Sequence, residues 1–463
     1  MEDRSRMSRR GFLKRAAGAA VGGIAFPYIV PSSALGKDGA VAPSNRITMG
    51  CIGMGGQGIF IMRGFLQLPE VQVVAVCDVN KETGGYVGSG FGKSWGSGQG
   101  GREPAKRIVE EFYASETAAG KYKGCATYAD FRELLGRNDI DTVMTAPPDH
   151  WHGIIGAAAA RAGKDVYAEK PLAYTVVEGR AICEAVKKCG VVWQSGSQQR
   201  SDRNFRFACE LVRNGRIGKV QTVKVTLYGV NRVINPTDPN LFKQMPVPEG
   251  FDYNMWLGPA PWAPYCPGRC LFNFRWISDY AGGQITDWAG HHIDIAQWGM
   301  GVENSGPVEI EGKGEFPKDG LYDTVENYNF TCKYAQGFTM IVESLPASYG
   351  GVRFEGSDGW IFVGRGKLEA EPKSILSTIL GPNDIHLYKS ENHLQNFIDC
   401  VRTRSETIVP AETGQRAITT GLLVIIAMKL GRKLQWDPAK ERFVNDAQAD
   451  RLLSRPMRSP WNL

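Results

Sequence analysis

Four of the six histidines in this chain occur in two short segments. His150 and His152 lie in "PDHWHG", and His291 and His292 lie in "DWAGHHIDIAQW", each with a carboxylate nearby. Histidine and carboxylate side chains together can bind zinc, and they can also transfer protons near neutral pH. The two segments therefore indicate either a metal centre or an acid–base site.

The second segment favours one reactive histidine over a metal-binding pair. If the segment is helical, Asp287, His291 and Asp294 are spaced by four and three residues and share one face. His292 then lies about 100° away around the helix axis. We therefore expect no metal at this site. Asp294 either orients the His291 ring or is a helix surface residue.

A glycine loop near the start of the chain predicts a dinucleotide site. Gly53, Gly55 and Gly58 in "GMGGQG" fit a GxGxxG pattern between a strand-like run and a helix-compatible one. These glycines allow a tight turn, close approach of a pyrophosphate, and close helix–strand packing. Asp78 ends the next strand-like run, where a carboxylate accepts hydrogen bonds from ribose hydroxyls. We expect NAD, although Lys81 leaves NADP open.

The elements that must position these residues change type along the chain. Up to about residue 200, strand-like and helix-like runs alternate, which predicts a Rossmann dinucleotide-binding domain over 45–200 with a parallel sheet. A glycine-rich insertion at 84–101 reads as a surface loop. Later runs alternate apolar and polar residues, which is typical of a large, mostly antiparallel open sheet. We place this α+β second domain at 201–440 and a tail at 441–463.

The segment 145–173, "TAPPDHWHGIIGAAAARAGKDVYAEKPLA", together with the glycine loop, resembles the Gfo/Idh/MocA oxidoreductases. The resemblance implies that Lys170 of "EKP" lies beside the nicotinamide and the reacting hydroxyl. Glu169 would contact the nicotinamide side of the cofactor, and a cis peptide would precede Pro171. A cation at that place stabilises a developing alkoxide.

The same resemblance assigns the residues around the histidine clusters. Pro148 and His152 keep the family's spacing and would contact the cofactor, although Pro147 stands where the family has threonine. His150 receives no role. Asp287 would position substrate and His291 would remove the proton of the hydroxyl that is oxidised. Candidate substrate contacts in the preceding aromatic loop are Arg275, Trp276 and Tyr280; a core role for Trp276 is an equal alternative.

The N-terminus resembles a twin-arginine export signal. The defined positions of that signal match Ser8, Arg9, Arg10, Phe12, Leu13 and Lys14. An apolar run of small residues follows, ending near Ala34, so we assign residues 1–36 to the signal and expect a periplasmic protein.

The composition of the chain argues against nucleic acid and the membrane interior as binding partners. The formal charge is +6, and without the basic N-terminus it falls to about +2, which offers no concentrated basic face for nucleic acid. The longest later apolar stretch, "GLLVIIAM", is far shorter than the roughly 20 residues needed to cross a bilayer, so we expect no stable membrane insertion. We expect Cys266 and Cys270 to be free thiols rather than a pair.

The combined hypothesis is an exported NAD(P)-dependent oxidoreductase that acts on a hydroxyl of a sugar, glycoside or cyclitol. Outside the cytoplasm no pool of free nicotinamide cofactor is known, so we expect NAD to be tightly bound. The alternative is a redox-neutral glycosidase or epimerase that passes through a keto-sugar. A binding protein with a vestigial cofactor site is disfavoured by the joint presence of Lys170, Asp287 and His291. The family resemblance also implies a homo-oligomer, a dimer or tetramer.

Overall fold

The computed structural model describes residues 45–84, 99–116, 121–228, 239–345 and 350–463. Residues Ile47–Leu463 form one compact unit. The predicted export signal and the middle of the glycine-rich insertion lie outside the described residues. The ends of that insertion pair with each other as β3 (Thr83–Gly84) and β4 (Gln99–Gly100).

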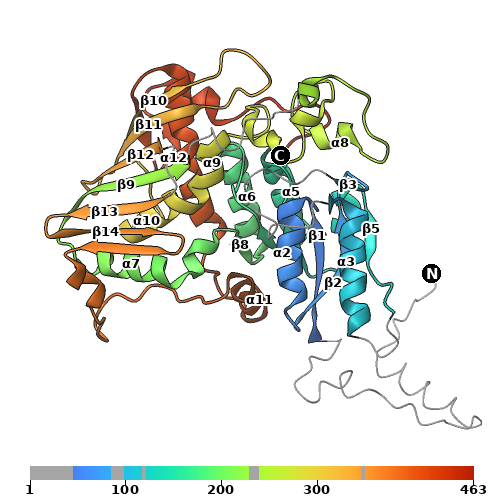
Figure 1. Ribbon diagram of the computed structural model, residues 1–463, viewed down its shortest axis with the longest axis horizontal. Helices are drawn as coiled ribbons and strands as arrows, with labels where there is room; N and C mark the ends of the chain where they lie inside the picture. The colour runs from blue at the N-terminus through green and yellow to red at the C-terminus, as the bar shows by residue number, and fades with distance from the viewer. Residues whose placement is uncertain (1–44, 85–98, 117–120, 229–238, 346–349) are drawn as a thin grey trace, which may run out of the picture. The chain divides into compact units, whose positions relative to one another are not determined.

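The first half of the described chain builds a parallel sheet of six strands in the order β5-β2-β1-β6-β7-β8. Helices cover it as the alternating pattern predicts, which confirms the Rossmann-like domain (Figure 1). The strands are β1 (Ile47–Ile52), β2 (Val71–Cys77), β5 (Ala126–Tyr128), β6 (Thr142–Thr145), β7 (Asp165–Ala168) and β8 (Trp193–Ser195). The helices are α2 (Gly56–Leu66), α3 (Arg102–Ser115), α4 (Phe131–Leu135), α5 (Asp149–Arg161) and α6 (Val176–Cys189).

The strand order fixes where a ligand can bind. Strand β1 pairs with β2 on one side and with β6 on the other. The crossover connection from β1 to β2 and the one from β6 to β7 therefore run in opposite directions along the sheet. In open parallel sheets a crevice forms at this switch point, outside the carboxyl ends of the strands. The glycine loop follows β1, and Pro147 and Pro148 follow β6, so both border this crevice.

The second half builds a sheet of nine strands in the order β15-β14-β13-β9-β12-β11-β10-β16-β17, which is antiparallel except where β9 runs parallel to β12. This confirms the predicted second fold class. The strands are β9 (Val220–Tyr228), β10 (Glu309–Glu315), β11 (Glu326–Lys333), β12 (Thr339–Leu345), β13 (Gly351–Gly356), β14 (Gly359–Gly364), β15 (Lys367–Glu371), β16 (Leu434–Asp437) and β17 (Arg442–Phe443).

Helices α9 (Gly283–Trp288) and α12 (Ala411–Leu430) of the second half lie between the two sheets in Figure 1. Alternate residues of β11 are buried and exposed, as expected for a sheet that is covered on one face. The α-helices of the second half are α7 (Arg203–Arg213), α8 (Tyr253–Leu257), α9 (Gly283–Trp288), α10 (Asp294–Met300), α11 (His393–Thr403), α12 (Ala411–Leu430) and α13 (Ala447–Asp450). None of the helices in the described ranges is long and apolar enough to cross a membrane.

The predicted boundary at residue 440 is wrong. Strands β16 and β17 form a hairpin across it, and β16 pairs with β10 of the large sheet. Near the C-terminus, the Trp461 ring packs 4.7 Å from the Trp151 ring of α5. The segment 441–463 is therefore part of the folded unit. Aromatic packing on distant elements gives little local pattern, which is why the sequence suggested a tail.

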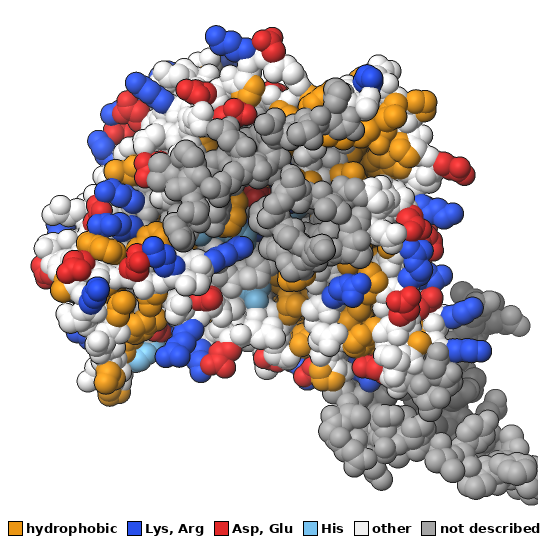
Figure 2. All heavy atoms as spheres, in the orientation of Figure 1, with side chains coloured by type: hydrophobic (Ala, Val, Ile, Leu, Met, Phe, Trp, Pro, Cys, Tyr) orange, Lys and Arg blue, Asp and Glu red, His pale blue; other side chains and the backbone are white. Residues whose placement is uncertain are grey.

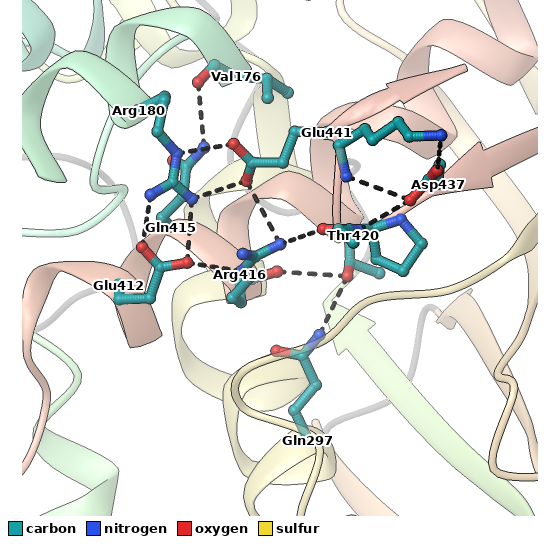
Figure 3. A network of polar contacts seen from close by, with 12 residues as sticks. Val176, Arg180, Gln297, Glu412, Gln415, Arg416, Thr420, Asp437 and Glu441 are labelled. Carbon is teal, nitrogen blue, oxygen red and sulfur yellow. Dashed lines mark hydrogen bonds and ion pairs between the residues drawn. The ribbon is translucent and has the colours of Figure 1, made fainter. Parts of the chain in front are cut away.

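An ion-pair network ties the Rossmann-like domain to the second domain (Figure 3). Arg180 of α6 contacts Glu412 of α12 at 2.6 Å and Glu441 of the β16–β17 turn at 2.7 Å. Arg416, one turn after Glu412, bonds the same carboxylate at 2.7 Å. The network links three segments that are far apart in sequence.

The loop before the histidine pair exposes apolar side chains. Figure 2 shows an apolar patch over the region of α8. The exposed large apolar residues of this region are Phe242, Met245, Val247 and Trp262. Cys266 and Cys270 of the same region are buried, and both are free thiols in the structure.

Candidate functional site

A cavity of about 230 Å³ lies at the switch point of the parallel sheet. The Rossmann-like domain supplies one wall and α9 with the preceding loop supplies the other. Residues with candidate roles that line it are Gly53, Gly55, Gln57, Asp78, Pro148, Asp149, Glu169, Lys170, Gln198, Phe272, Arg275, Asp287, Trp288, His291 and Arg365.

The glycine loop leaves room for a pyrophosphate. Gly53 has φ +83, and a Cβ there would lie 2.6 Å from the Ala146 carbonyl carbon. A Cβ on Gly58 would lie 1.9 Å from the Gly53 oxygen, so the α2 N-terminus can approach β1 only with glycine. Gly55 is the N-cap of α2 and brings no side chain to the amides of the first turn. These free amides suit a pyrophosphate, so this end of the cavity fits a dinucleotide.

Asp78 is fixed by backbone donors at the end of β2. Its Oδ2 accepts from the Met54 amide at 2.7 Å, and its Oδ1 accepts from the Asn80 amide at 2.7 Å. Burial raises its pKa to about 6 against the effect of these hydrogen bonds. Arg102 donates to the Asp78 carbonyl at 3.1 Å. Sequence reasoning considered Lys81 as the nearby cation and missed Arg102, which lies beyond the insertion.

Glu169 lies on the cavity wall and is almost fully buried. Its Oε1 accepts a hydrogen bond of 2.9 Å from Gln198. Burial raises its pKa, partly opposed by Lys170. Gln198 also lines the cavity and was not predicted, because it lies in a short 3₁₀ turn without a motif.

His152 differs from the expectation. Pro148 is the N-cap of α5 and lines the cavity, but His152 is not part of the lining. Its Nε2 pairs with the Pro147 carbonyl at 2.9 Å, and burial lowers its pKa to about 4. The neutral ring therefore braces the loop that borders the cavity, and its contact with the cofactor stays a prediction. His150 is also buried, with Nε2 2.9 Å from the Trp256 carbonyl.

The Asp287 carboxylate contacts two cations, Lys170 and Arg275. The Lys170 Nζ lies 2.8 Å from Asp287 Oδ1, and the Arg275 Nε lies 3.1 Å from the same oxygen. Burial opposes ionisation of Asp287, but the two cations outweigh burial and lower its pKa to about 2. The peptide between Lys170 and Pro171 is cis, as expected. Asp287 thus stays ionised and holds both cations at the cavity.

His291 also lies on the cavity wall, in a π-helical turn, η9 (Ala289–Ile293), between α9 and α10. Its buried Nδ1 has no hydrogen-bond partner in the structure. Burial, with a smaller contribution from Lys170, lowers its pKa well below the usual range, so the ring is neutral. A neutral imidazole with an unpaired ring nitrogen can take part in proton transfer.

Because of the π-helical turn, Asp287, His291 and Asp294 do not follow the α-helical spacing that predicts one shared face. Asp294 does not pair with His291 and is not a surface residue; it forms two 2.7 Å hydrogen bonds with the buried Arg200. His292 stacks on Trp288 with ring centres 5.0 Å apart. The sequence spacing assumed α-helical geometry, and a π-helical turn, common at functional sites, shifts the residues that follow it.

Two predicted substrate contacts are corrected. Arg275 lines the cavity, but Trp276 and Tyr280 do not, and each is at most 1% exposed in an aromatic core that includes Trp256. The alternative core role of Trp276 is therefore the correct one. Phe272 and Trp288 supply the aromatic walls instead.

Two charged wall residues were missed. Asp149, the first residue of α5, lies in the cavity beside the Lys170 group. Arg365, in the turn between β14 and β15, places its guanidinium 4.9 Å from the Trp288 ring centre. Asp149 lies within the "PDHWHG" segment but received no role there, and Arg365 lies outside any recognisable motif. Among the described residues, no cluster of three or more His, Cys, Asp or Glu could hold a metal ion.

Comparison with known families agrees with this geometry. Residues 47–197 match "Oxidoreductase family, NAD-binding Rossmann fold", and residues 205–463 match "Oxidoreductase family, C-terminal alpha/beta domain". The chain belongs to the Gfo/Idh/MocA oxidoreductase family. It is therefore an enzyme of the NAD-dependent oxidoreductase class.

Relatives of this Gfo/Idh/MocA protein include both dehydrogenases and a glycosidase. It is 26% identical to scyllo-inositol 2-dehydrogenase (NAD(+)) of Bacillus subtilis over 66% of this chain and 80% of that protein. It is 27% identical to the alpha-N-acetylgalactosaminidase of Shewanella oneidensis over 46% of this chain and 44% of that protein. The solved aldose-aldose oxidoreductase of Caulobacter crescentus superposes with TM-score 0.57 at 19% identity, covering 84% of this chain and 99% of that one.

Proposed function

We propose that this protein transfers hydride between tightly bound NAD and a ring hydroxyl of a sugar, glycoside or cyclitol. The observation that carries the proposal is that Lys170, Asp287 and His291 line the same cavity as the glycine loop. When bound, NAD supplies the hydride acceptor and donor. Asp78 favours an unphosphorylated ribose, because its carboxylate would repel a 2′-phosphate.

Side chains of the cavity would stabilise charge, accept the proton and pack against the sugar ring. The Lys170 ammonium, held by Asp287, stabilises negative charge that develops on the substrate oxygen. The neutral His291 ring accepts the hydroxyl proton. Trp288 and Phe272 provide apolar faces against which a sugar ring can pack.

The test is incubation of the purified protein with a panel of glycosides, free sugars and inositols while absorbance of reduced nicotinamide is followed. The proposal is supported if a compound of the panel reduces the nicotinamide in the parent protein but not in the Lys170→Met variant. If no compound of the panel reduces the nicotinamide although the protein is folded and contains its nucleotide, the result argues against the proposal. Lys224→Met, which removes an exposed ion pair with Glu355 on the large sheet, is the matched control.

We also propose that residues 1–36 direct export by the twin-arginine route and that NAD is loaded before export. The paired Arg9 and Arg10 support this proposal. Replacement of both by lysine should retain the protein in the cytoplasm, as measured by fractionation. Mass spectrometry of nucleotide released on denaturation should find NAD near one per chain in the exported protein.

A redox-neutral glycosidase or epimerase is the second candidate. Similarity to a protein named alpha-N-acetylgalactosaminidase favours it, as does the additional carboxylate, Asp149, in the cavity. Release of aglycone without net reduced nicotinamide would identify this cycle, whereas net reduction would identify a dehydrogenase.

We further propose a homo-oligomer. The large sheet has a face with exposed residues in β10 and β11, which suits a second sheet of the same kind. Light scattering coupled to size exclusion should give the mass of a dimer or tetramer; a monomer across the working concentration range would contradict this.

A further inference from the structure

We propose that Asp149 is a second proton-transfer group of the cavity, which acts on the C–H next to the oxidised carbon rather than on the hydroxyl. This inference rests on the proposed function in its redox-neutral form. Oxidation of a hydroxyl requires one proton acceptor, for which His291 is available. Epimerisation or elimination of an aglycone requires another group that can take up and return a proton.

The position of Asp149 meets this requirement. It is the first residue of α5, it lines the cavity, and it is 6% exposed. Its electrostatic neighbours are Arg275, Asp287 and Lys170, the three residues of the ion-pair group. It therefore lies where a sugar bound against Lys170 would also be within the range of its charge.

The Asp149 carboxyl is uncommitted. Lys170 and Arg275 both direct their hydrogen bonds to Oδ1 of Asp287. Within the described part of the chain, no other residue forms a side-chain hydrogen bond or ion pair with the Asp149 carboxyl. Two acids thus border the same two cations in different states: Asp287 is bonded and permanently ionised, and Asp149 is free to exchange a proton.

The charges around Asp149 set its proton affinity. Burial is the largest effect, and together with Asp287 it outweighs Arg275 and Lys170 and raises the pKa to about 7. A carboxyl with such a pKa is present in both forms near neutral pH, which a group that both removes and returns a proton requires. An ordinary exposed carboxylate would be too weak a base for a carbon acid.

The step balances without an additional reactant. Once the ring hydroxyl is a ketone, the Asp149 carboxylate takes the proton from the adjacent carbon, and the electron pair of that C–H bond moves into the enolate. In an epimerase the ring turns over in the cavity, and the Asp149 carboxyl returns the proton to the opposite face of the same carbon. In a glycosidase the enolate expels the aglycone oxygen, and the C–O bond breaks. That oxygen takes the proton from the Asp149 carboxyl, which becomes a carboxylate again.

Deuterium exchange separates this step from oxidation. The purified protein, with its retained nucleotide, is incubated in D₂O with a glycoside that reduces it. Deuterium next to the oxidised carbon is measured by NMR, the reduced nicotinamide formed in one turnover by absorbance, and the bound nucleotide by mass spectrometry. Asp149→Asn keeps the side-chain volume, and Asp139→Asn, which removes an exposed partner of Arg137, is the matched control.

The expected result is selective. Asp149→Asn should lose at least 100-fold in deuterium incorporation and aglycone release while it keeps nucleotide content and single-turnover reduction within about threefold of the parent. Asp149→Glu, which retains a carboxyl, should recover part of the exchange. Unchanged exchange in Asp149→Asn, or loss of nucleotide together with reduction, would overturn the inference. Parent protein that reduces nicotinamide without any exchange would overturn it too, and would leave the hydride-transfer proposal standing. Failure of the parent to reduce nicotinamide at all would count against the proposed function itself.

Discussion

The Lys170 Nζ and the Asp287 Oδ1 are 2.8 Å apart although the two residues are separated by 117 positions in the sequence. Lys170 follows β7 of the Rossmann-like domain, and Asp287 lies in α9 of the second domain. Both side chains are less than one-fifth exposed. The Lys170 ammonium is therefore placed by one domain and held by the other, so this ion pair forms only when both domains are packed together.

Replacement of Lys170 by methionine should slow turnover strongly with little effect on folding. The side chain keeps its length, and Asp287 retains Arg275 as a partner at 3.1 Å. Loss of the charge beside the developing alkoxide should lower kcat by about 10²- to 10⁴-fold with NAD content unchanged. Steady-state kinetics beside the Lys224→Met control checks this. A kcat within a factor of three of the parent would contradict the assignment.

His291→Asn should also lower kcat by about 10²-fold or more, because the proton acceptor is removed. Burial keeps the pKa of His291 well below its usual range. The ring is thus neutral near pH 6.5, the ordinary pKa of histidine, and the pH profile of kcat/KM in the parent should show no protonation of this histidine there. His386→Asn, at an exposed histidine far from α9 in sequence, is the control. An inflection near pH 6.5 that disappears in His291→Asn would refute the neutral-ring assignment.

The cofactor end of the site was predictable because its geometry is local. Gly53, Gly55, Gly58 and Asp78 lie within one strand–helix–strand unit, so spacing along the chain nearly determines their arrangement in space. The alternation of element types likewise predicted both sheets. Their strand order required the long-range pairing that only the structure shows.

The substrate end was only partly predictable. Lys170, Asp287 and His291 came from family resemblance, and the structure brings them to one cavity. The contribution of Asp149 depends on its burial and on Arg275 and Asp287, which follow it in the sequence only after the second domain has begun, and a local pattern encodes neither. Trp276 failed as a substrate contact for a related reason: an aromatic residue in a loop has the same local signature whether it faces a cavity or a core.

Asp78→Asn should shift the cofactor preference towards NADP. The amide oxygen can still accept one backbone hydrogen bond from Met54 or Asn80, so the loop should persist, but the negative charge is lost. The ratio of Kd for NADP to Kd for NAD should fall by about tenfold, which corresponds to about 1.4 kcal/mol. Titration of nucleotide-free protein by calorimetry measures both constants. Asp358→Asn, at an exposed turn, should leave the ratio unchanged.

Stability should depend on pH through Asp149. Burial raises its pKa from 3.8 to about 7 in the folded protein, in the field of Arg275, Lys170 and Asp287. A raised carboxyl pKa adds stability that is fully present below the unfolded value and is lost as pH rises through the folded one. Between pH 4 and pH 8 the free energy of unfolding should therefore fall by up to about 4 kcal/mol relative to Asp149→Asn.

Denaturant unfolding at several pH values measures this difference. Asp139→Asn, whose side chain is 64% exposed, should follow the parent at every pH. Parallel curves for the parent and Asp149→Asn over this range would show that Asp149 does not titrate near neutrality.

Arg180→Ala should weaken the joint between the domains without a direct effect on chemistry. The guanidinium bonds Glu412 through two nitrogens at 2.6 and 2.9 Å and Glu441 at 2.7 and 2.9 Å (Figure 3). Its removal leaves two half-buried carboxylates with Arg416 as their remaining cation. We expect a loss of about 2 kcal/mol in the free energy of unfolding, less than for a fully buried pair.

The exposed Arg216–Asp384 pair provides the comparison, since Arg216→Ala should cost less than about 1 kcal/mol. Arg180 does not line the cavity, so kcat of the folded variant should stay within a factor of two of the parent at temperatures well below unfolding. In a double-mutant cycle, Arg180→Ala and Glu441→Gln should together destabilise less than the sum of the single changes, because the second removes a carboxylate that the first leaves unpaired. Strict additivity would mean that the network does not act as a unit in joining α6 to the β16–β17 hairpin.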